Sequence, residues 1–314
     1  MSESVLNAQA PSSVIMVRPH RFSPNTQTSA DNSFQRLPKA SERKNLAVDA
    51  YRESSLAEKA LRAHGIQVHM FEDTTTETPD SVFPNNWFST HHNGQVAIYP
   101  MYAENRRKER RTDIIDLLKQ QYHVCQIVDY SACENDGLFL EGTGAMVIDH
   151  ITQTVFVIES KRANKALVDM FCNQFNYQSV MFEALDQRGK PIYHTNVFMG
   201  IATEFAVLAP DMIVDRYQRD SVIERLSASG RKIVALSPQQ VNAFAGNCIE
   251  LNGTKGRLLA LSQTAFETLT PSQVSTIEES ATLLPIDVST LELAGGSIRC
   301  MIAGIHLRPR AIHN

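Results

Sequence analysis

Short apolar runs alternate along the chain with amphipathic stretches of helical spacing, and this alternation occurs five times. In each repeat an apolar run of strand length is followed by a helical pattern and then by a second strand-like run. Glycine, Asn-Gly and Thr-Pro signals mark several of the boundaries. The expected strand, helix and strand span residues 14–18, 39–63 and 66–72; 96–99, 105–121 and 122–130; 154–159, 162–175 and 179–184; 205–208, 217–229 and 232–236; 257–261, a helix opening at 270–271, and 283–288. The pattern predicts an α/β fold.

A distinctive segment accompanies each repeat. These segments are PDSVFPNNWFS from Pro79, LEGTGAMVID from Leu140, YHTNVFMGIA from Tyr193, FAGNCIELNG from Phe244 and GGSIRCMIAG from Gly295. Measured between equivalent positions they lie 61, 53, 52 and 50 residues apart. Modules of this size cannot bury their faces singly, so the repeat indicates a closed ring with the segments around one central mouth. We expect a fivefold pseudosymmetric α/β propeller of ββαβ-type modules; an open α/β sheet is the alternative.

The predicted domain organisation is a loose tail over residues 1–13 and a single catalytic domain over residues 14–310. Of the 314 residues, 43% are hydrophobic and 20% are charged, with a formal net charge of −4. Such a chain is globular and has no overall positive field, which argues against nucleic-acid and membrane partners and favours a small-molecule substrate. Five widely spaced cysteines without a signal peptide predict reduced thiols and a cytoplasmic protein.

Three chemistry-bearing residues occupy corresponding places in different modules: Glu141 in LEGTG, His194 in YHTN and Cys300 in GGSIRC. A thiol becomes a nucleophile when a base or a positive environment generates its thiolate, and an imidazole needs an acceptor that orients it. A cysteine, a histidine and a glutamate together meet both needs. The remaining cysteines have simpler interpretations: Cys125, Cys172 and Cys248 as packing residues, and Cys133 as an exposed loop thiol.

Five ordered motifs resemble those of the pentein, or guanidino-group-modifying, superfamily. They are VIMVRPHRF, PDSVFPNNWFSTH, YPMYAENRRKERR, LEGTGAMV and GGSIRCMIAGIHLRP, within residues 14–309, and they are most similar to the citrulline-utilisation hydrolases, or citrulline ureidases. The resemblance implies a covalent mechanism with Cys300 as nucleophile, His194 as general acid and base, and Glu141 supporting His194. It also implies that Asp80 binds the amino groups of a guanidinium, and that neither a metal nor an organic cofactor takes part.

Two departures from the superfamily pattern bear on the substrate. Asn86 and Asn196 stand where deiminases commonly carry aspartates. An amide can donate a hydrogen bond to the carbonyl oxygen of a neutral ureido group, whereas a carboxylate cannot. We therefore expect citrulline to be hydrolysed to ornithine, ammonia and carbon dioxide. Arginine deiminase or dihydrolase activity stays open, because succinylarginine dihydrolases also use Asn-rich sites, and an amidinotransferase is a further alternative.

Other residues are weaker candidates for substrate binding. An amino-acid substrate has an α-carboxylate that suits arginine, and Arg18, Arg299 and Arg107 are the candidates for it. Trp87 is expected beside Asn86 in the pocket, and a position in the core is the alternative. His91 and His92 precede Asn93-Gly94 and are expected at an exposed hairpin tip, because two adjacent histidines alone do not make a zinc site. A homo-oligomer is possible.

Overall fold

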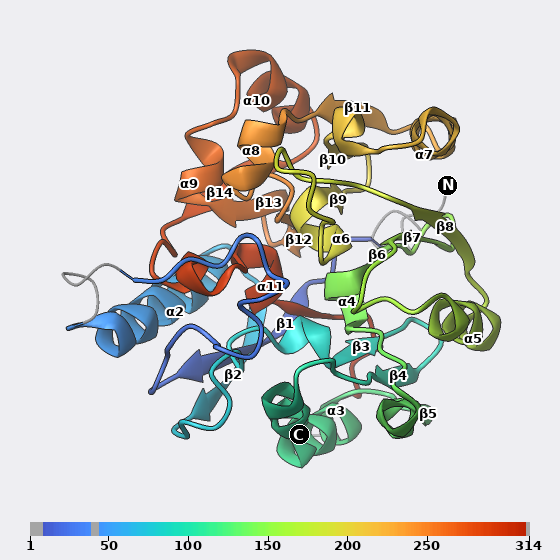
Figure 1. Cartoon of the computed structure of the whole chain (residues 1–314). Helices are drawn as coiled ribbons and strands as arrows, with labels where there is room; N and C mark the ends of the chain where they lie inside the picture. The colour runs from blue at the N-terminus through green and yellow to red at the C-terminus, as the bar shows by residue number, and fades with distance from the viewer. Residues whose placement is uncertain (1–8, 39–43, 312–314) are drawn as a thin grey trace.

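The computed structural model describes residues 9–38 and 44–311, and these form five three-stranded sheets arranged about a central axis (Figure 1). The strand orders are β15-β1-β2, β3-β4-β5, β6-β7-β8, β9-β10-β11 and β12-β13-β14. In every sheet the middle strand pairs antiparallel with one neighbour and parallel with the other. The longer helices lie outside the ring in Figure 1. The prediction of a fivefold α/β propeller is confirmed.

The strands are β1 Ser13–Pro19, β2 Gln67–Asp73, β3 Phe88–Thr90, β4 Gln95–Ile98, β5 Gln126–Asp129, β6 Met146–Asp149, β7 Thr154–Ile158, β8 Gln178–Phe182, β9 Met199–Ile201, β10 Phe205–Leu208, β11 Lys232–Ala235, β12 Ile249–Gly253, β13 Gly256–Ser262, β14 Thr282–Ile286 and β15 Ala303–Ile305. The α-helices are α2 Leu46–Ala63, α3 Thr112–Gln121, α4 Gly142–Ala145, α5 Lys165–Phe175, α6 Thr195–Phe198, α7 Arg216–Ala228, α8 Pro238–Asn242, α9 Gln263–Phe266, α10 Pro271–Glu278 and α11 Ile298–Met301. Short 3₁₀ helices are η1 Pro84–Asn86, η2 Glu104–Glu109, η3 Ser131–Asp136, η4 Pro210–Met212 and η5 Leu291–Ala294.

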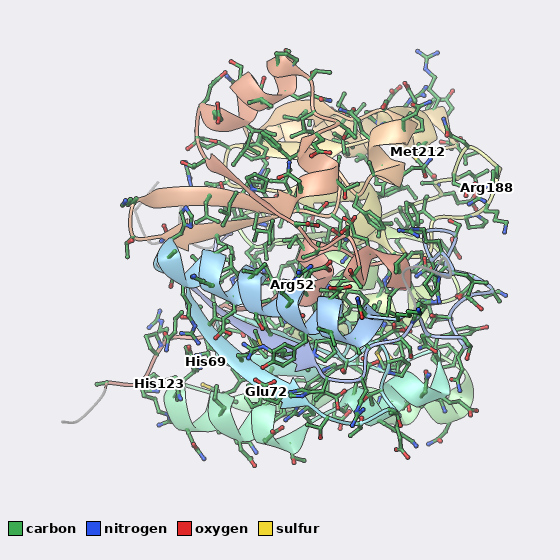
Figure 2. All side chains as sticks on the ribbon, turned by 90° about the vertical axis from the view of Figure 1, so that its left-hand side faces the viewer. Arg52, His69, Glu72, His123, Arg188 and Met212 are labelled. Atoms are coloured by element: carbon green, nitrogen blue, oxygen red, sulfur yellow. The ribbon has the colours of Figure 1, made fainter. Side chains whose placement is uncertain are left out.

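The outer helices form where the sequence pattern predicts them. Figure 2 shows α2, which carries Arg52, crossing beside β2, which carries His69 and Glu72. This helix buries Ala57 and Leu61 in the same apolar cluster as β1 and β2, because the two positions are four residues apart on one helical face. The helix predicted from residue 39 begins at Leu46 in the structure, and residues 39–43 lie outside the described residues.

The helix predicted over residues 105–121 is instead two helices, η2 and α3, separated by extended backbone at Arg110 and Arg111. In a 3₁₀ helix the side chains of residues three apart eclipse one another. Arg106 and Glu109 have this spacing, and both are buried and joined by two hydrogen bonds of 2.9 Å. The 3₁₀ turn thus places the two side chains of this internal ion pair on one face.

The ring closes where the last strand, β15, pairs antiparallel with the first, β1, with Ser13 opposite Ile305. The tail predicted over residues 1–13 is wrong for its last five residues. Gln9 is buried, and its amide nitrogen donates hydrogen bonds to the carbonyl oxygens of Ile148 (3.0 Å) and Ile201 (3.1 Å). These bonds order the chain ahead of β1; residues 1–8 lie outside the described residues.

Two further expectations need correction. Cys172 and Cys248 are buried as predicted, but Cys125 is exposed, because it precedes β5 rather than lying inside a strand. Of the two histidines at the β3–β4 hairpin only His92 is exposed, whereas His91 is buried with its ring centroid 4.3 Å from that of Phe175. The described residues contain no helix that is long and apolar enough to cross a membrane.

Candidate active site

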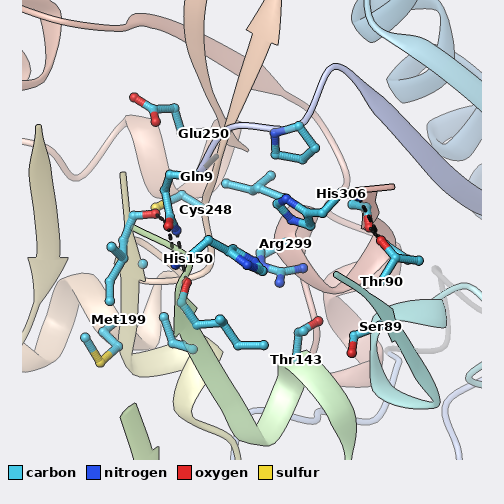
Figure 3. Close-up of a pocket in the computed structure, with 18 of the residues that line it drawn as sticks. Gln9, Ser89, Thr90, Thr143, His150, Met199, Cys248, Glu250, Arg299 and His306 are labelled. Atoms are coloured by element: carbon cyan, nitrogen blue, oxygen red, sulfur yellow. Dashed lines mark hydrogen bonds between the residues drawn. The ribbon is translucent and has the colours of Figure 1, made fainter. Parts of the chain in front are cut away.

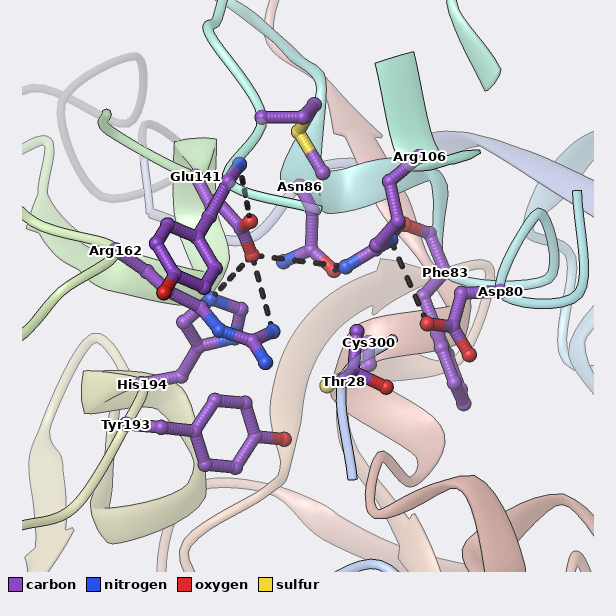
Figure 4. Close-up of polar contacts among 12 residues, drawn as sticks. Thr28, Asp80, Phe83, Asn86, Arg106, Glu141, Arg162, Tyr193, His194 and Cys300 are labelled. Carbon is purple, nitrogen blue, oxygen red and sulfur yellow. Dashed lines mark hydrogen bonds and ion pairs between the residues drawn. The ribbon is translucent and has the colours of Figure 1, made fainter. Parts of the chain in front are cut away.

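Short helical turns precede four of the five inner strands and bring distant motif segments to one end of the ring. These are η1 before β3, α4 before β6, α6 before β9 and α11 before β15. Their side chains meet in the region drawn in Figure 4. One small cavity is lined by Asn32, Asp80, Phe83, Asn86, Arg106, Arg162, Tyr193, His194, Ala294, Gly296 and Cys300. The predicted nucleophile and the predicted base therefore face the same space.

His194 and Glu141 form a buried pair. The His194 Nε2 atom lies 2.8 Å from Glu141 Oε2, and the other carboxylate oxygen accepts the Tyr102 backbone N–H at 3.0 Å. Burial raises the pKa of Glu141, but Arg162, His194 and Arg106 outweigh this and bring the pKa well below its usual range. An ionised carboxylate only accepts hydrogen bonds, so Nε2 carries the proton and Nδ1 keeps its lone pair.

The His194 imidazole is neutral at physiological pH in this structure. Burial lowers its pKa to about 4, while the hydrogen bond to Glu141 acts in the opposite direction. A neutral, oriented imidazole with a carboxylate behind it can accept a proton and be stabilised as the imidazolium. The pair thus has the arrangement of a general base.

The Cys300 sulfur is buried and receives two amide donors. Asn196 Nδ2 and Asn247 Nδ2 each lie 3.2 Å from Sγ. Asn247 is itself fixed, since its Nδ2 also donates to the Asn196 carbonyl oxygen at 3.0 Å and its Oδ1 accepts the Arg299 backbone N–H at 3.0 Å. Donors at this position stabilise negative charge on sulfur, which is the form that acts as nucleophile.

Asn86 presents an oriented donor at the cavity wall. Arg106 Nη1 donates to Asn86 Oδ1 at 3.0 Å, and arginine has no acceptor, so the amide can adopt only this orientation. Asn86 Nδ2 is buried and has no hydrogen-bond partner among the described residues. Such a donor suits a carbonyl oxygen or a developing oxyanion.

Asp80 also lines the cavity and presents a hydrogen-bond acceptor, whereas Asn86 presents a donor. Its Oδ2 accepts a hydrogen bond from Asn25 Nδ2 at 2.8 Å, and Arg106 Nε lies 3.7 Å away. The other oxygen, Oδ1, is buried and has no hydrogen-bond partner among the described residues. Burial raises the pKa of Asp80, although Arg106, Asn25 and Arg162 oppose this. This oxygen is available to a donor on a ligand.

The segment before α2 covers the cavity. Arg162 donates to Asp31 at 2.7 and 3.0 Å, Asn25 holds Asp80, and Asn32 lines the wall. The cavity volume of about 10 Å³ admits no more than a water-sized molecule, so an amino acid does not fit in this structure.

Four predicted substrate-binding residues do not line this cavity. Arg18 forms ion pairs with Glu58 and Glu72 next to α2. Arg107 contacts Glu134 and the Met101 carbonyl oxygen. Trp87 is buried against Phe88, and Arg299 lines a separate cavity. Trp87 and Arg299 each adjoin a site residue in sequence, but successive side chains of a helical turn point in different directions.

Sequence analysis missed several residues that the structure brings to the site. Asn25, Arg162, Tyr193 and Asn247 were not singled out, although Tyr193 and Asn247 lie inside two of the motif segments. Arg106 belongs to the basic run from which Arg107 was chosen. Its 3 % side-chain exposure distinguishes it from Arg107, at 31 %.

Gly144 is expected to be essential because side chains of the site occupy the space that a β-carbon would need. A β-carbon there would lie 2.0 Å from Asn86 Nδ2 and 2.8 Å from His194 Nδ1. We expect Gly144→Ala to lower kcat by about 100-fold or more, since displacing reacting groups by about 1 Å can have an effect of this size. Steady-state kinetics would test this, and a thermal melt would separate a loss of catalysis from a loss of folding. An unchanged kcat in Gly144→Ala would show that neither side chain needs its position.

Comparison with known proteins identifies one family model that matches the sequence. The model of the family described as N,N dimethylarginine dimethylhydrolase, eukaryotic, matches residues 18–307. No curated protein matches the sequence.

Solved structures show the same fold at low identity. A mutant of the N-terminal domain of ArgZ bound to substrate, from an arginine dihydrolase of the ornithine-ammonia cycle in cyanobacteria, has a TM-score of 0.72 at 14% identity and covers 93% of this chain and 97% of that chain. Unliganded AgrE has a TM-score of 0.74 at 14% identity, and this chain spans 40% of its length, with 96% of this chain covered. DDAH from Pseudomonas aeruginosa, a mutant complexed with citrulline, has a TM-score of 0.63 at 13% identity, covering 94% of this chain and 100% of that chain.

A match over nearly the whole chain, together with five pentein modules, gives the assignment. The chain belongs to the N,N dimethylarginine dimethylhydrolase (eukaryotic) family, within the pentein superfamily of guanidino-group-modifying proteins.

Proposed function

We propose that this protein is a cysteine-dependent hydrolase that cleaves the ureido group of citrulline and yields ornithine, ammonia and carbon dioxide. The observation that carries the proposal is the orientation of Asn86. Because Arg106 occupies Oδ1, Nδ2 is left as a buried donor without a hydrogen-bond partner among the described residues, and Asn86 lines the cavity. A guanidinium presents only donors, whereas a ureido group presents a carbonyl oxygen that can accept this one.

In the first half of the reaction, His194 Nδ1 accepts the thiol proton and the Cys300 sulfur attacks the ureido carbon. The oxygen gains negative charge and accepts the hydrogen bond of Asn86 Nδ2. The His194 imidazolium, stabilised by Glu141, then protonates the terminal nitrogen, which leaves as ammonia. The product of this half is an S-linked acyl intermediate on Cys300 that still carries the ornithine side of the substrate.

In the second half, water replaces ammonia. The neutral His194 removes a proton from water, the hydroxide attacks the acyl carbon, and the carbon–sulfur bond breaks to restore Cys300. The released N-carboxylated ornithine loses carbon dioxide. All of these steps use side chains of this chain alone. Arg162 is the candidate partner of the substrate α-carboxylate, because its present partner, Asp31, lies in the covering segment.

Arginine is the second candidate substrate, and Asp80 favours it. A buried carboxylate oxygen without a partner among the described residues matches a guanidinium N–H. The structural neighbours ArgZ and AgrE are consistent with this alternative, since ArgZ is an arginine dihydrolase and AgrE has been solved in complex with L-arginine. An arginine reaction would pass through the same acyl chemistry after the loss of a first ammonia.

A cytoplasmic location and self-association are further predictions of the sequence.

The substrate is tested by incubating the pure protein with citrulline, arginine, methylated arginines and succinylarginine, and by following ornithine and ammonia. Citrulline is expected to give ornithine and ammonia in equal amounts. Ornithine and two equivalents of ammonia from arginine would support the second candidate. Consumption of arginine with citrulline as the end product would contradict the proposed role of Asn86. Product formation that depends on an added amine would indicate an amidinotransferase.

Asn86→Asp gives a sharper test of the amide argument. The variant replaces an oxyanion donor with a carboxylate, and loss of one such donor typically lowers kcat by about 100–1000-fold. We expect kcat/KM for citrulline to fall by about this factor. The matched control is Asn242→Asp on the exposed surface of α8. Equal activity of Asn86→Asp and the parent protein on citrulline would exclude the donor role.

A further inference from the structure

The carboxyl ends of three inner strands bring three histidines together. His92 follows β3, His150 follows β6 and His306 follows β15. The active-site turns precede these same strands, so the histidines lie at the other end of each strand. Figure 3 shows His150 and His306 in this region, with Arg299, Thr90 and Gln9 around them. The group therefore joins three different modules away from Cys300.

The three imidazoles are close enough to share one ion. One ring nitrogen from each histidine can be chosen so that all three lie within 4.8 Å of one another. The ring centroids of His150 and His306 are 3.9 Å apart, and that of His92 lies 5.5 and 5.1 Å from them. Nitrogens bound to tetrahedral zinc at 2.0–2.1 Å lie about 3.4 Å apart, so a rearrangement of roughly 1 Å completes the geometry.

Hydrogen bonds hold two of the histidines in place. The His306 backbone N–H donates to Thr90 Oγ1 at 2.8 Å, and this hydroxyl donates to the Gly304 carbonyl oxygen at 3.0 Å. The His150 backbone N–H donates to Gln9 Oε1 at 2.9 Å. The His150 ring is oriented too, since Nδ1 lies 3.0 Å from the Tyr177 hydroxyl and leaves Nε2 for a ligand. A second partner of this kind is typical of metal-binding histidines.

Two of the three histidines line a cavity that has room for a water ligand. His150 and His306 line a cavity of about 60 Å³ together with Gln9, Thr90 and Arg299. From three converging imidazoles on anchored backbone, beside a polar cavity, we propose that His92, His150 and His306 form a binding site for a divalent transition metal of the zinc, cobalt or nickel type. Imidazole nitrogens suit these ions, and a water molecule in the cavity would occupy the remaining coordination position.

A metal ion at this site would stabilise the closed ring of modules and would not take part in the reaction at Cys300. His306 follows β15, which closes the propeller against β1. His92 and His150 belong to the two following modules. An ion that binds the folded state alone stabilises it by mass action. The melting temperature is therefore expected to rise as zinc is added.

The test uses the full chain in a Cys300→Ser background, which removes the active-site thiol as a competing ligand. Chelator-treated protein is titrated with ZnCl₂ by calorimetry and with CoCl₂ by visible absorption. We expect one equivalent per chain and the intense bands of tetrahedral cobalt. His92→Ala and His306→Ala should each weaken binding by more than about 100-fold, and Tyr177→Phe by about 10-fold, as outer partners of metal ligands do.

The matched control is His123→Ala, which removes an exposed histidine outside the group and should leave affinity unchanged. His92 is exposed, so its variant tests the site even if His306→Ala reduces folding, which circular dichroism would reveal. No zinc or cobalt binding, or binding that survives both His92→Ala and His306→Ala at full affinity, would overturn the proposal. Binding of phosphate to the metal-free protein with loss in the same variants would identify an anion site instead and would equally overturn it.

Discussion

Cys300→Ser is expected to fold like the parent protein and to lose about 10⁴-fold or more of its turnover. The two amides beside this position can still donate to a hydroxyl, so the structural change is small. A serine hydroxyl is far less acidic than a thiol, and His194 cannot generate a comparable concentration of nucleophile from it. Ornithine formation from citrulline measures the loss, and circular dichroism checks the fold.

The control for this variant is Cys125→Ser, which changes an exposed thiol outside the cavity. It should retain the parent kcat. If Cys300→Ser kept more than a few per cent of the parent activity, the reaction would not depend on a sulfur nucleophile, and the proposed role of the Cys300 thiol would be excluded.

Glu141→Gln is expected to reduce both activity and stability. Glu141 Oε2 accepts a hydrogen bond from His194 Nε2 at 2.8 Å. The guanidinium groups of Arg162 and Arg106 lie 3.3 and 3.6 Å from the same oxygen. Without its charge, the imidazolium loses its stabilising partner, and kcat should fall by about 100-fold or more. Removing one partner from a buried ionic network also costs about 3–5 kcal/mol of unfolding free energy.

Urea unfolding and steady-state kinetics measure these two effects separately. Asp169→Asn is the matched control, because Asp169 pairs with Lys165 on the exposed surface of α5, where the loss should stay within about 1 kcal/mol. If Glu141→Gln unfolded at the parent urea midpoint and turned over at the parent rate, the buried carboxylate would have neither role.

The modular fold could be predicted from sequence because each of its signals is local. Strand and helix lengths, Gly-containing turns and the Thr270-Pro271 helix start are all set by short stretches of sequence. Thr270 does form a capping box with Gln273, with Pro271 at the first turn of α10. Five such modules imply a ring because each leaves an apolar face that only a neighbouring module can bury.

The polar lining of the site could be predicted only in part. Glu141, His194 and Cys300 lie in glycine-flanked motifs, and the structure brings His194 and Cys300 to one cavity. Arg162 has no such context, since its role depends on Asp31, which is 131 residues away.

The choice among neighbouring residues failed for a geometric reason. In the basic run, the 3₁₀ geometry of η2 turns Arg106 inward and leaves Arg107 partly exposed. Both residues are arginines and carry the same charge. Only backbone geometry separates them, and the sequence predicted an α-helix at this place.

The most direct test of covalent ureido hydrolysis is intact-mass spectrometry of the parent enzyme, acid-quenched within its first turnovers on citrulline. The mechanism predicts an adduct with the mass of citrulline less one ammonia, mapped to the Cys300 peptide and absent from Cys300→Ser. Release of ornithine during a single turnover while Cys300 stays unmodified at every time point would contradict it.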